Sequence, residues 1–85
     1  MIPLPNFDVL ERDEVFKWCT MTRAQIARAL LLPHQSRIIP QAISNYVWNK
    51  YTAMELREKG DIARALVYEH ICDMIYNSLP QQYRW

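Results

Sequence analysis

Apolar residues recur at the three- and four-residue spacing of a helix in four successive segments of the chain. In residues 7–19 this pattern fits either one helix or two short ones, and Asn6 or Asp8 is a suitable cap. Thr22 is a good N-cap for a second helix, which we expect to run to about Leu32 because a proline follows. Each segment gathers its apolar residues along one side, which predicts helices that pack against one another.

A loop over residues 33–39 is predicted to precede a long third helix. Pro40 suits the first turn of that helix, where a backbone N–H has no partner within the helix. Gly60 is expected to stop the helix, because glycine readily adopts the left-handed conformation just past a helix end. Asp61 is a suitable cap for a fourth helix, and Pro80 limits that helix at its other end.

The fourth helix, over residues 62–79, carries more apolar surface than an ordinary surface helix. Its apolar positions cover nearly half of its circumference, whereas a helix with one buried side needs a stripe of roughly 100°. These positions are Val67, Tyr68, Ile71, Cys72, Met74, Ile75 and Leu79. The width of the arc predicts either a central place in the bundle or a subunit interface, and we expect a homodimer through residues 62–79.

Together these segments predict an all-α fold, a compact bundle of four to five helices in a single domain over residues 1–85. Residues 1–6 contain two prolines and are expected to form an extended N-terminal arm. Residues 80–85 are expected to form a short C-terminal tail with an exposed end. The chain contains no internal repeat and no linker long enough to divide it.

Composition and charge narrow the classes of function. The chain is 51% hydrophobic and 22% charged, which is typical of a folded domain, and its net charge of +1 gives no bulk attraction to nucleic acid or anionic lipid. Gly60 is the only glycine, which excludes the glycine-rich loops of nucleotide-binding enzymes. The sequence has no N-terminal signal pattern and no apolar run of membrane-spanning length, so we expect a cytoplasmic protein with no membrane partner.

Two cysteines and two histidines are the candidate metal ligands and nucleophiles. Cys19, His34, His70 and Cys72 lack the short paired spacings of zinc sites. On a helix, His70 and Cys72 lie about 200° apart, so they do not converge on one ion. We therefore expect no metal, no cofactor and no enzymatic activity. A Cys–His pair assembled by the fold is the open alternative.

Residues 22–30, "TRAQIARAL", and residues 40–46, "PQAISNY", resemble the first helix and the start of the base-reading helix of the helix-turn-helix family. The connection departs from that family, because residues 31–39 exceed its usual turn by about six residues and contain no glycine. The resemblance implies duplex DNA as a partner. The residues expected to contact it carry phosphate-binding or base-reading side chains: Arg28, Arg37, Gln41, Ser44, Asn45, Asn49 and Lys50.

The run "LREKGDIARA", residues 56–65, resembles a run in the PerC-type family of bacterial transcription activators. The resemblance is confined to this run, which is also what a capped junction between two helices produces. It therefore assigns no role to any single residue.

Trp48 is predicted to lie on the polar side of the third helix, about 140° around the helix from the apolar Ile43. Tryptophan on a polar surface is a frequent anchor of protein interfaces. The residues expected to bind a partner share this side of the helix or belong to the aromatic tail: Trp48, Asn45, Thr52, Leu56, Tyr83 and Trp85. The alternative is that the N-terminal arm or another helix covers Trp48.

The leading hypothesis is a small non-enzymatic regulatory or adaptor protein that binds a protein partner through its helix faces and self-associates. The alternative is a DNA-binding transcriptional regulator with an atypical helix-turn-helix over residues 22–50. A binding test with duplex DNA distinguishes the two, because only the second predicts affinity that falls steeply with salt.

Overall fold

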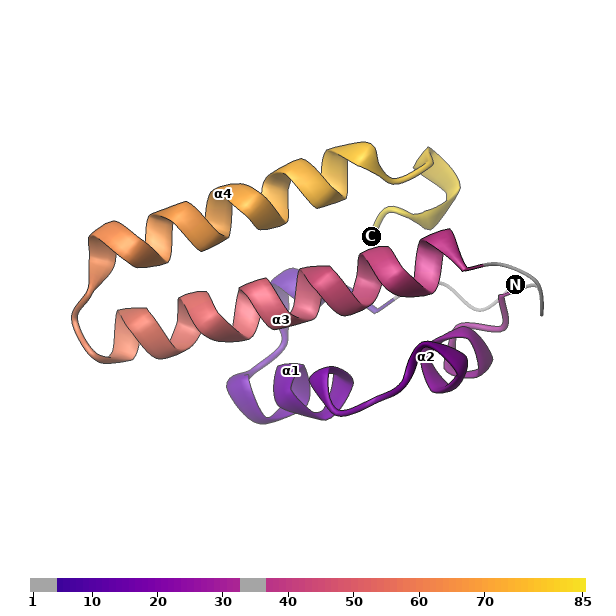
Figure 1. Ribbon diagram of the computed structural model, residues 1–85, viewed down its shortest axis with the longest axis horizontal. Coiled ribbons are helices and arrows are strands. Elements are labelled where there is room, and N and C mark those ends of the chain that lie inside the picture. The colour runs from indigo at the N-terminus through magenta and orange to yellow at the C-terminus, as the bar shows by residue number, and fades with distance from the viewer. Residues whose placement is uncertain (1–4, 33–36) are drawn as a thin grey trace.

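Helices account for every regular element in residues 5–32 and 37–85, the part of the chain that the computed structural model describes (Figure 1). In chain order the elements are η1 (Phe7–Val9), α1 (Arg12–Cys19), α2 (Arg23–Ala29), α3 (Ile38–Glu58), α4 (Ile62–Ser78) and η2 (Gln81–Tyr83), where η marks a short 3₁₀ helix. The predicted all-α fold is confirmed. Within these residues, none of the helices combines the length and the apolar character needed to traverse a lipid bilayer.

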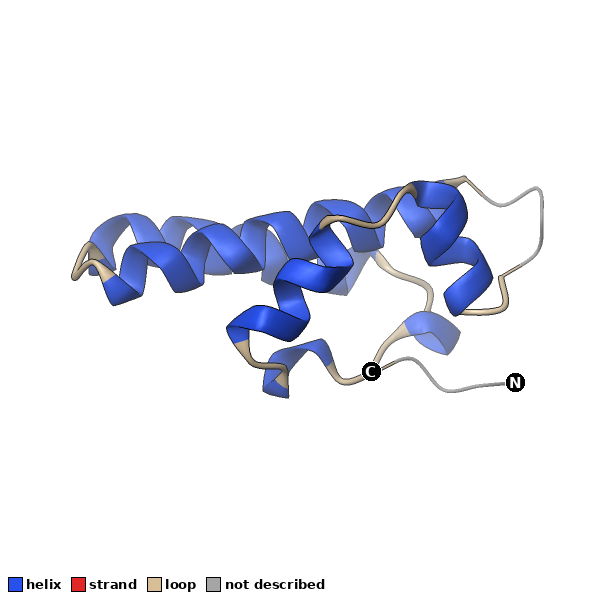
Figure 2. Cartoon of the chain, turned by 90° about the horizontal axis from the view of Figure 1, so that it is seen from below, coloured by secondary structure: helices blue, strands red, loops and turns tan. Residues whose placement is uncertain are grey.

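α3 is the central helix of the bundle. α4 runs antiparallel beside it in a long hairpin, and α1 and α2 lie against a different side of α3 (Figures 1 and 2). Two buried thiols mark these contacts. Cys19 of α1 donates to the carbonyl oxygen of Val47 at 3.3 Å, and Cys72 of α4 donates to that of Tyr46 at 3.6 Å. Neighbouring carbonyl groups of α3 therefore face two different helices.

The segment over residues 7–19 forms two short pieces, η1 and α1, which is one of the two predicted alternatives. Asn6 caps the first piece, because its side-chain oxygen accepts a hydrogen bond from the N–H of Asp8 at 3.0 Å. α1 follows after Glu11, which makes no side-chain cap. Residues 1–4 of the predicted N-terminal arm lie outside the described residues.

The second helix begins where predicted and ends earlier. The Thr22 hydroxyl accepts from the N–H of Gln25, whose side chain accepts from the N–H of Thr22, so Thr22 is confirmed as the cap. The prediction that this helix runs to about Leu32 is wrong, because α2 ends at Ala29. Leu31 has a left-handed backbone with φ +53°, and the N–H groups just past the helix donate back into its last turn. This is a Schellman closure without a glycine.

α3 begins at Ile38, two residues before Pro40. The predicted loop over residues 33–39 is therefore too long at its C-terminal end. Pro40 occupies the first turn, as expected, and is fully buried there. Residues 33–36 of the predicted loop lie outside the described residues.

The junction between α3 and α4 forms as the sequence predicts. Gly60 has φ +85°, and the N–H groups of Gly60 and Asp61 donate to the carbonyl oxygens of Arg57 and Leu56 at 3.0 and 2.8 Å. Asp61 then caps α4, because its side chain accepts from the N–H of Arg64 at 3.3 Å. This closure turns the chain back on itself and makes α3 and α4 antiparallel.

The core is centred on the side of α3 that faces α1 and α2. Its largest fully buried side chains are Phe7, Val15, Ile26, Pro40, Ile43 and Val47. Moving one such large apolar side chain from water into the core contributes about 1.5–3 kcal/mol before conformational entropy is counted. Phe7 also links the two ends of the described chain, because its ring lies 4.8 Å from that of Trp85 between centroids. The same ring lies 5.2 Å from that of Trp18 in α1.

Candidate binding surfaces

One side of α3 is left free because its neighbours pack on two other sides. α3 has 21 residues, whereas α1 and α2 have eight and seven, and together these two cover one side of α3. α4 covers a second side along the hairpin. The third side carries Asn45, Trp48, Thr52 and Leu56, which we call the Trp48 face.

Trp48 is 48% exposed on this face. Asn45 is also exposed, and Thr52 and Leu56 are half-buried. Ile43, about 140° around the helix from Trp48, is fully buried. Within residues 5–32 and 37–85, no helix buries Trp48. The alternative of a cover by the N-terminal arm concerns residues 1–4, which lie outside the described part of the chain.

The polar side chains beside Trp48 are held by hydrogen bonds within α3. Thr52 donates through its hydroxyl to the carbonyl oxygen of Trp48 at 2.9 Å, and Gln41 donates through Nε2 to Oδ1 of Asn45 at 3.0 Å. Asn49 donates through Nδ2 to the carbonyl oxygen of Asn45 at 2.7 Å. The Trp48 face is therefore an ordered, uncharged surface with one large apolar group. Interfaces commonly place such a group at their centre.

The aromatic tail belongs to the core cluster, and the expectation of an exposed tail end is wrong. Tyr83 and Trp85 are both half-buried. The Trp85 ring lies 4.7 Å from that of Tyr46 and 4.8 Å from that of Tyr76, between centroids. Tyr76 also donates through its hydroxyl to the carbonyl oxygen of Trp85 at 2.6 Å. The tail folds back because the edge-to-face contacts of its rings in this cluster are more favourable than their exposure to water.

The apolar arc of α4 is divided between core and surface. Its seven residues differ in exposure: Cys72 and Leu79 are buried, Tyr68, Ile71 and Ile75 are half-buried, and Val67 and Met74 are 58% and 59% exposed. Cys72 faces α3, where its thiol donates to the carbonyl oxygen of Tyr46, and Leu79 belongs to the core cluster. Val67, Ile71 and Met74 follow one another at i, i+4 and i+7, so they line one side of the helix. We call these three residues the α4 stripe.

The residues predicted to contact DNA are not all on one surface. They differ in exposure: Arg28, Arg37, Gln41 and Asn45 are exposed, and Ser44, Asn49 and Lys50 are half-buried. Lys50 lies toward α4. The pKa of Glu69 is lowered chiefly by its hydrogen bond to Arg57 and further by the charge of Lys50, which places that ammonium group near α4. Of the exposed members, Arg28 lies in α2, and the other three lie within or just before the first eight residues of α3.

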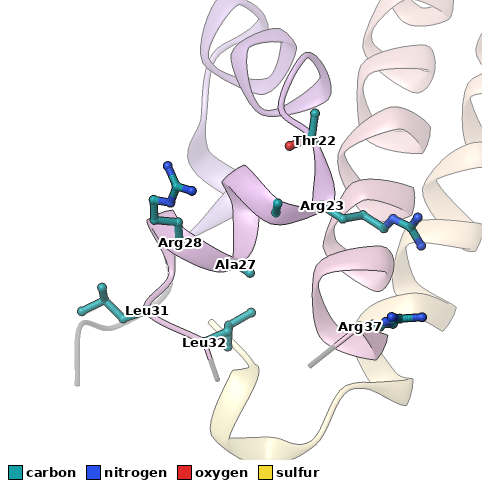
Figure 3. Close-up of a pocket in the computed structure, with 8 residues that line it drawn as sticks. Thr22, Arg23, Ala27, Arg28, Leu31, Leu32 and Arg37 are labelled. Atoms are coloured by element: carbon teal, nitrogen blue, oxygen red, sulfur yellow. The ribbon is translucent and has the colours of Figure 1, made fainter. Parts of the chain in front are cut away.

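A hollow between α2 and the start of α3 is lined by three arginines, Arg23, Arg28 and Arg37 (Figure 3). Its remaining lining residues are uncharged: Thr22, Ala24, Ala27, Leu31 and Leu32. The sequence analysis named Arg28 and Arg37 among the residues expected to contact DNA, but the net charge of +1, an average over the whole chain, did not indicate that they share a hollow with Arg23. The distribution of charge reveals this basic surface, since residues 15–54 contain no aspartate or glutamate.

The titratable groups in the interior have structural partners. Burial raises the pKa of Cys19 and of Cys72 to about 11, so both thiols stay protonated at neutral pH and are poor nucleophiles. Tyr46 donates through its hydroxyl to Oδ1 of Asp8 at 2.7 Å, and burial together with this bond raises the pKa of Tyr46. In residues 5–32 and 37–85, no group of three or more His, Cys, Asp or Glu side chains is arranged to hold a metal ion.

Fold and surfaces define an all-α domain built around a long helical hairpin, with the Trp48 face, the α4 stripe and the basic hollow on its outside. Comparison of the chain with models of protein families, with curated proteins and with solved structures gives no match. Function is therefore argued from these surfaces alone.

Proposed function

We propose that this protein is a small non-enzymatic regulatory or adaptor protein that binds a protein partner on the Trp48 face. The observation that carries the proposal is the 48% exposure of Trp48 on a side of α3 that no described helix covers. Covering the exposed half of an indole removes roughly 100 Å² of apolar surface from water, which contributes about 2.5 kcal/mol. This gross contribution corresponds to about two orders of magnitude in affinity, from which the entropic costs of association and of ordering side chains are subtracted.

Photo-crosslinking in source cells tests this proposal. A photo-crosslinking phenylalanine analogue replaces Asn45 or Thr52 on the Trp48 face, and Asn77, an exposed residue of α4, in the matched control. We expect positions 45 and 52 to give the same crosslinked protein, position 77 to give none of it, and Trp48→Ala to abolish the product. Equal products from all three positions, or a product that persists after Trp48→Ala, contradict the proposal.

We further propose that a second copy of the chain packs on the α4 stripe. Val67 and Met74 are more than half exposed, and the heptad-like spacing of the stripe matches the seam by which helices pair. A homodimer through α4 leaves the Trp48 face available.

Sedimentation equilibrium over a range of concentrations tests self-association. The wild type is expected to show the dimer mass. Val67→Glu together with Met74→Glu should give a monomer with unchanged far-ultraviolet circular dichroism, because both side chains already reach solvent. Leu66→Glu makes the same kind of change at an exposed position of α4 that lies about 100° around the helix from Val67, and it should stay dimeric. A wild type that is monomeric throughout contradicts this part of the proposal and leaves the Trp48 face to the crosslinking test.

A further inference from the structure

Charge is unevenly divided along the chain. All nine acidic residues lie within residues 8–14 and 55–73. The 40 residues between them, 15–54, contain five cations: Lys17, Arg23, Arg28, Arg37 and Lys50. A net charge of +1 therefore conceals a span of the chain that carries only positive charge.

The arginines of the two regions differ in their partners. Of the four arginines outside the acid-free span, Arg12, Arg57 and Arg64 each form a salt bridge with a carboxylate. The fourth, Arg84, donates to the carbonyl oxygens of Leu79 and Asn77. Arg23, Arg28 and Arg37 are exposed and form no salt bridge with any residue in the described part of the chain. Their charge is therefore available to an external anion.

The directions of these three side chains indicate what kind of anion fits. In the view of Figure 3, Arg23 and Arg37 extend toward the same side, whereas Arg28 points the other way. All three line one hollow, yet their guanidinium groups do not converge on one point. A single phosphate or carboxylate would meet at most two of them. A polymer with evenly spaced negative charges can meet all three.

The surface that continues from the arginines favours a nucleic acid. Gln41 follows Arg37 by one turn of α3, is exposed, and donates through Nε2 to Oδ1 of Asn45. Amide side chains at the start of an exposed helix can hydrogen-bond to base edges, and an α-helix fits the major groove of duplex DNA. None of the residues that line the hollow is acidic, so no carboxylate of the lining would repel the phosphates.

From these observations we infer that duplex DNA binds across α2 and the first turns of α3. Arg23, Arg28 and Arg37 contact phosphates, and Gln41 faces the bases. The DNA surface adjoins the Trp48 face, because Gln41 donates to Asn45 at the edge of that face, but none of the four residues assigned to DNA belongs to it.

Binding of a short fluorescein-labelled duplex of mixed sequence, measured by anisotropy over a series of salt concentrations, tests the inference. The double variant Arg28→Gln and Arg37→Gln should reduce the slope of log affinity against log salt by about 1.8, because each lost phosphate contact removes about 0.9. The control double variant Lys59→Gln and Arg64→Gln removes the same charge at the tip of the hairpin and should leave the slope unchanged. Circular dichroism confirms that both variants are folded.

Three outcomes overturn the inference. The first is that the wild type fails to bind the duplex at low salt. The second is that both double variants reduce the slope of log affinity against log salt by the same amount. The third is that polyglutamate of matched charge displaces the labelled duplex as well as unlabelled duplex does. The last result would identify an acidic polypeptide as the ligand. Trp48→Ala should bind the duplex as the wild type does, so a failure of the DNA inference and a failure of the Trp48 proposal remain distinguishable.

Discussion

Two tryptophans in contrasting surroundings give the sharpest prediction for stability. Trp85 lies against three aromatic rings, with centroids 4.8 Å from Phe7, 4.7 Å from Tyr46 and 4.8 Å from Tyr76. Trp48 lies on the free side of α3 and is 48% exposed. Replacing each by alanine removes the same atoms from a packed cluster in one case and from a surface in the other.

The expected losses in the free energy of unfolding differ severalfold. Truncating a well-packed tryptophan costs about 3–5 kcal/mol, and we expect about 3 kcal/mol for Trp85→Ala because Trp85 is only half-buried. Trp48→Ala should cost about 1 kcal/mol or less, since surface changes are small and alanine is the better helix former. A chain of this length has a total stability of about 4–13 kcal/mol, so only the first change removes a large share of it.

Urea unfolding followed by far-ultraviolet circular dichroism measures both changes. Trp85→Phe keeps an aromatic ring in the cluster, so it should lose less stability than Trp85→Ala. If Trp48→Ala loses as much stability as Trp85→Ala, then Trp48 belongs to the core. The proposal of a free binding face would then fail.

Three further predictions follow from the helix ends and from one ion pair. Leu31→Gly should raise stability by about 0.5–1 kcal/mol, because a left-handed backbone costs an L-residue about 1–2 kcal/mol and the entropy of glycine offsets part of the gain; an unchanged or lower urea midpoint contradicts this. Gly60→Ala should lower stability by about 1 kcal/mol through the same strain, with nothing within 4 Å of the added Cβ to clash, and a neutral result would refute it. Arg57 lowers the pKa of Glu69, so their bridge stabilises the fold above the pKa of the unfolded carboxyl and is lost as pH falls through the folded value. Arg57→Gln should therefore weaken the decline of the urea midpoint on acidification, and an identical pH profile would count against the bridge.

The sequence predicts a helix end correctly where a single residue determines that end. Thr22, Gly60 and Asp61 mark their helix ends in the sequence and take those positions in the structure. The end of α2 could not be predicted in this way, because Leu31 adopts a left-handed conformation that leucine rarely takes. The following proline therefore suggested a longer helix than the one that forms.

Helical periodicity does not predict contacts between parts of the chain that are distant in sequence. The position of Trp48 follows from projection around one helix, so it was predicted. The burial of Trp85 depends on Phe7 and Tyr46, which are far away in the sequence, and no local pattern indicates it. The acid-free span over residues 15–54 is different, because it can be read directly from the sequence. The net charge of the whole chain does not indicate it, since that value averages over both regions.

The exposure of Trp48 is the central claim, and its fluorescence tests that claim most directly. The emission spectrum of Trp48→Phe, subtracted from that of the wild type at a concentration where the protein is monomeric, isolates the indole at position 48. We predict the red-shifted emission of a hydrated indole that acrylamide quenches readily. Blue-shifted emission that resists acrylamide would show that Trp48 is covered within the chain, and it would contradict the account.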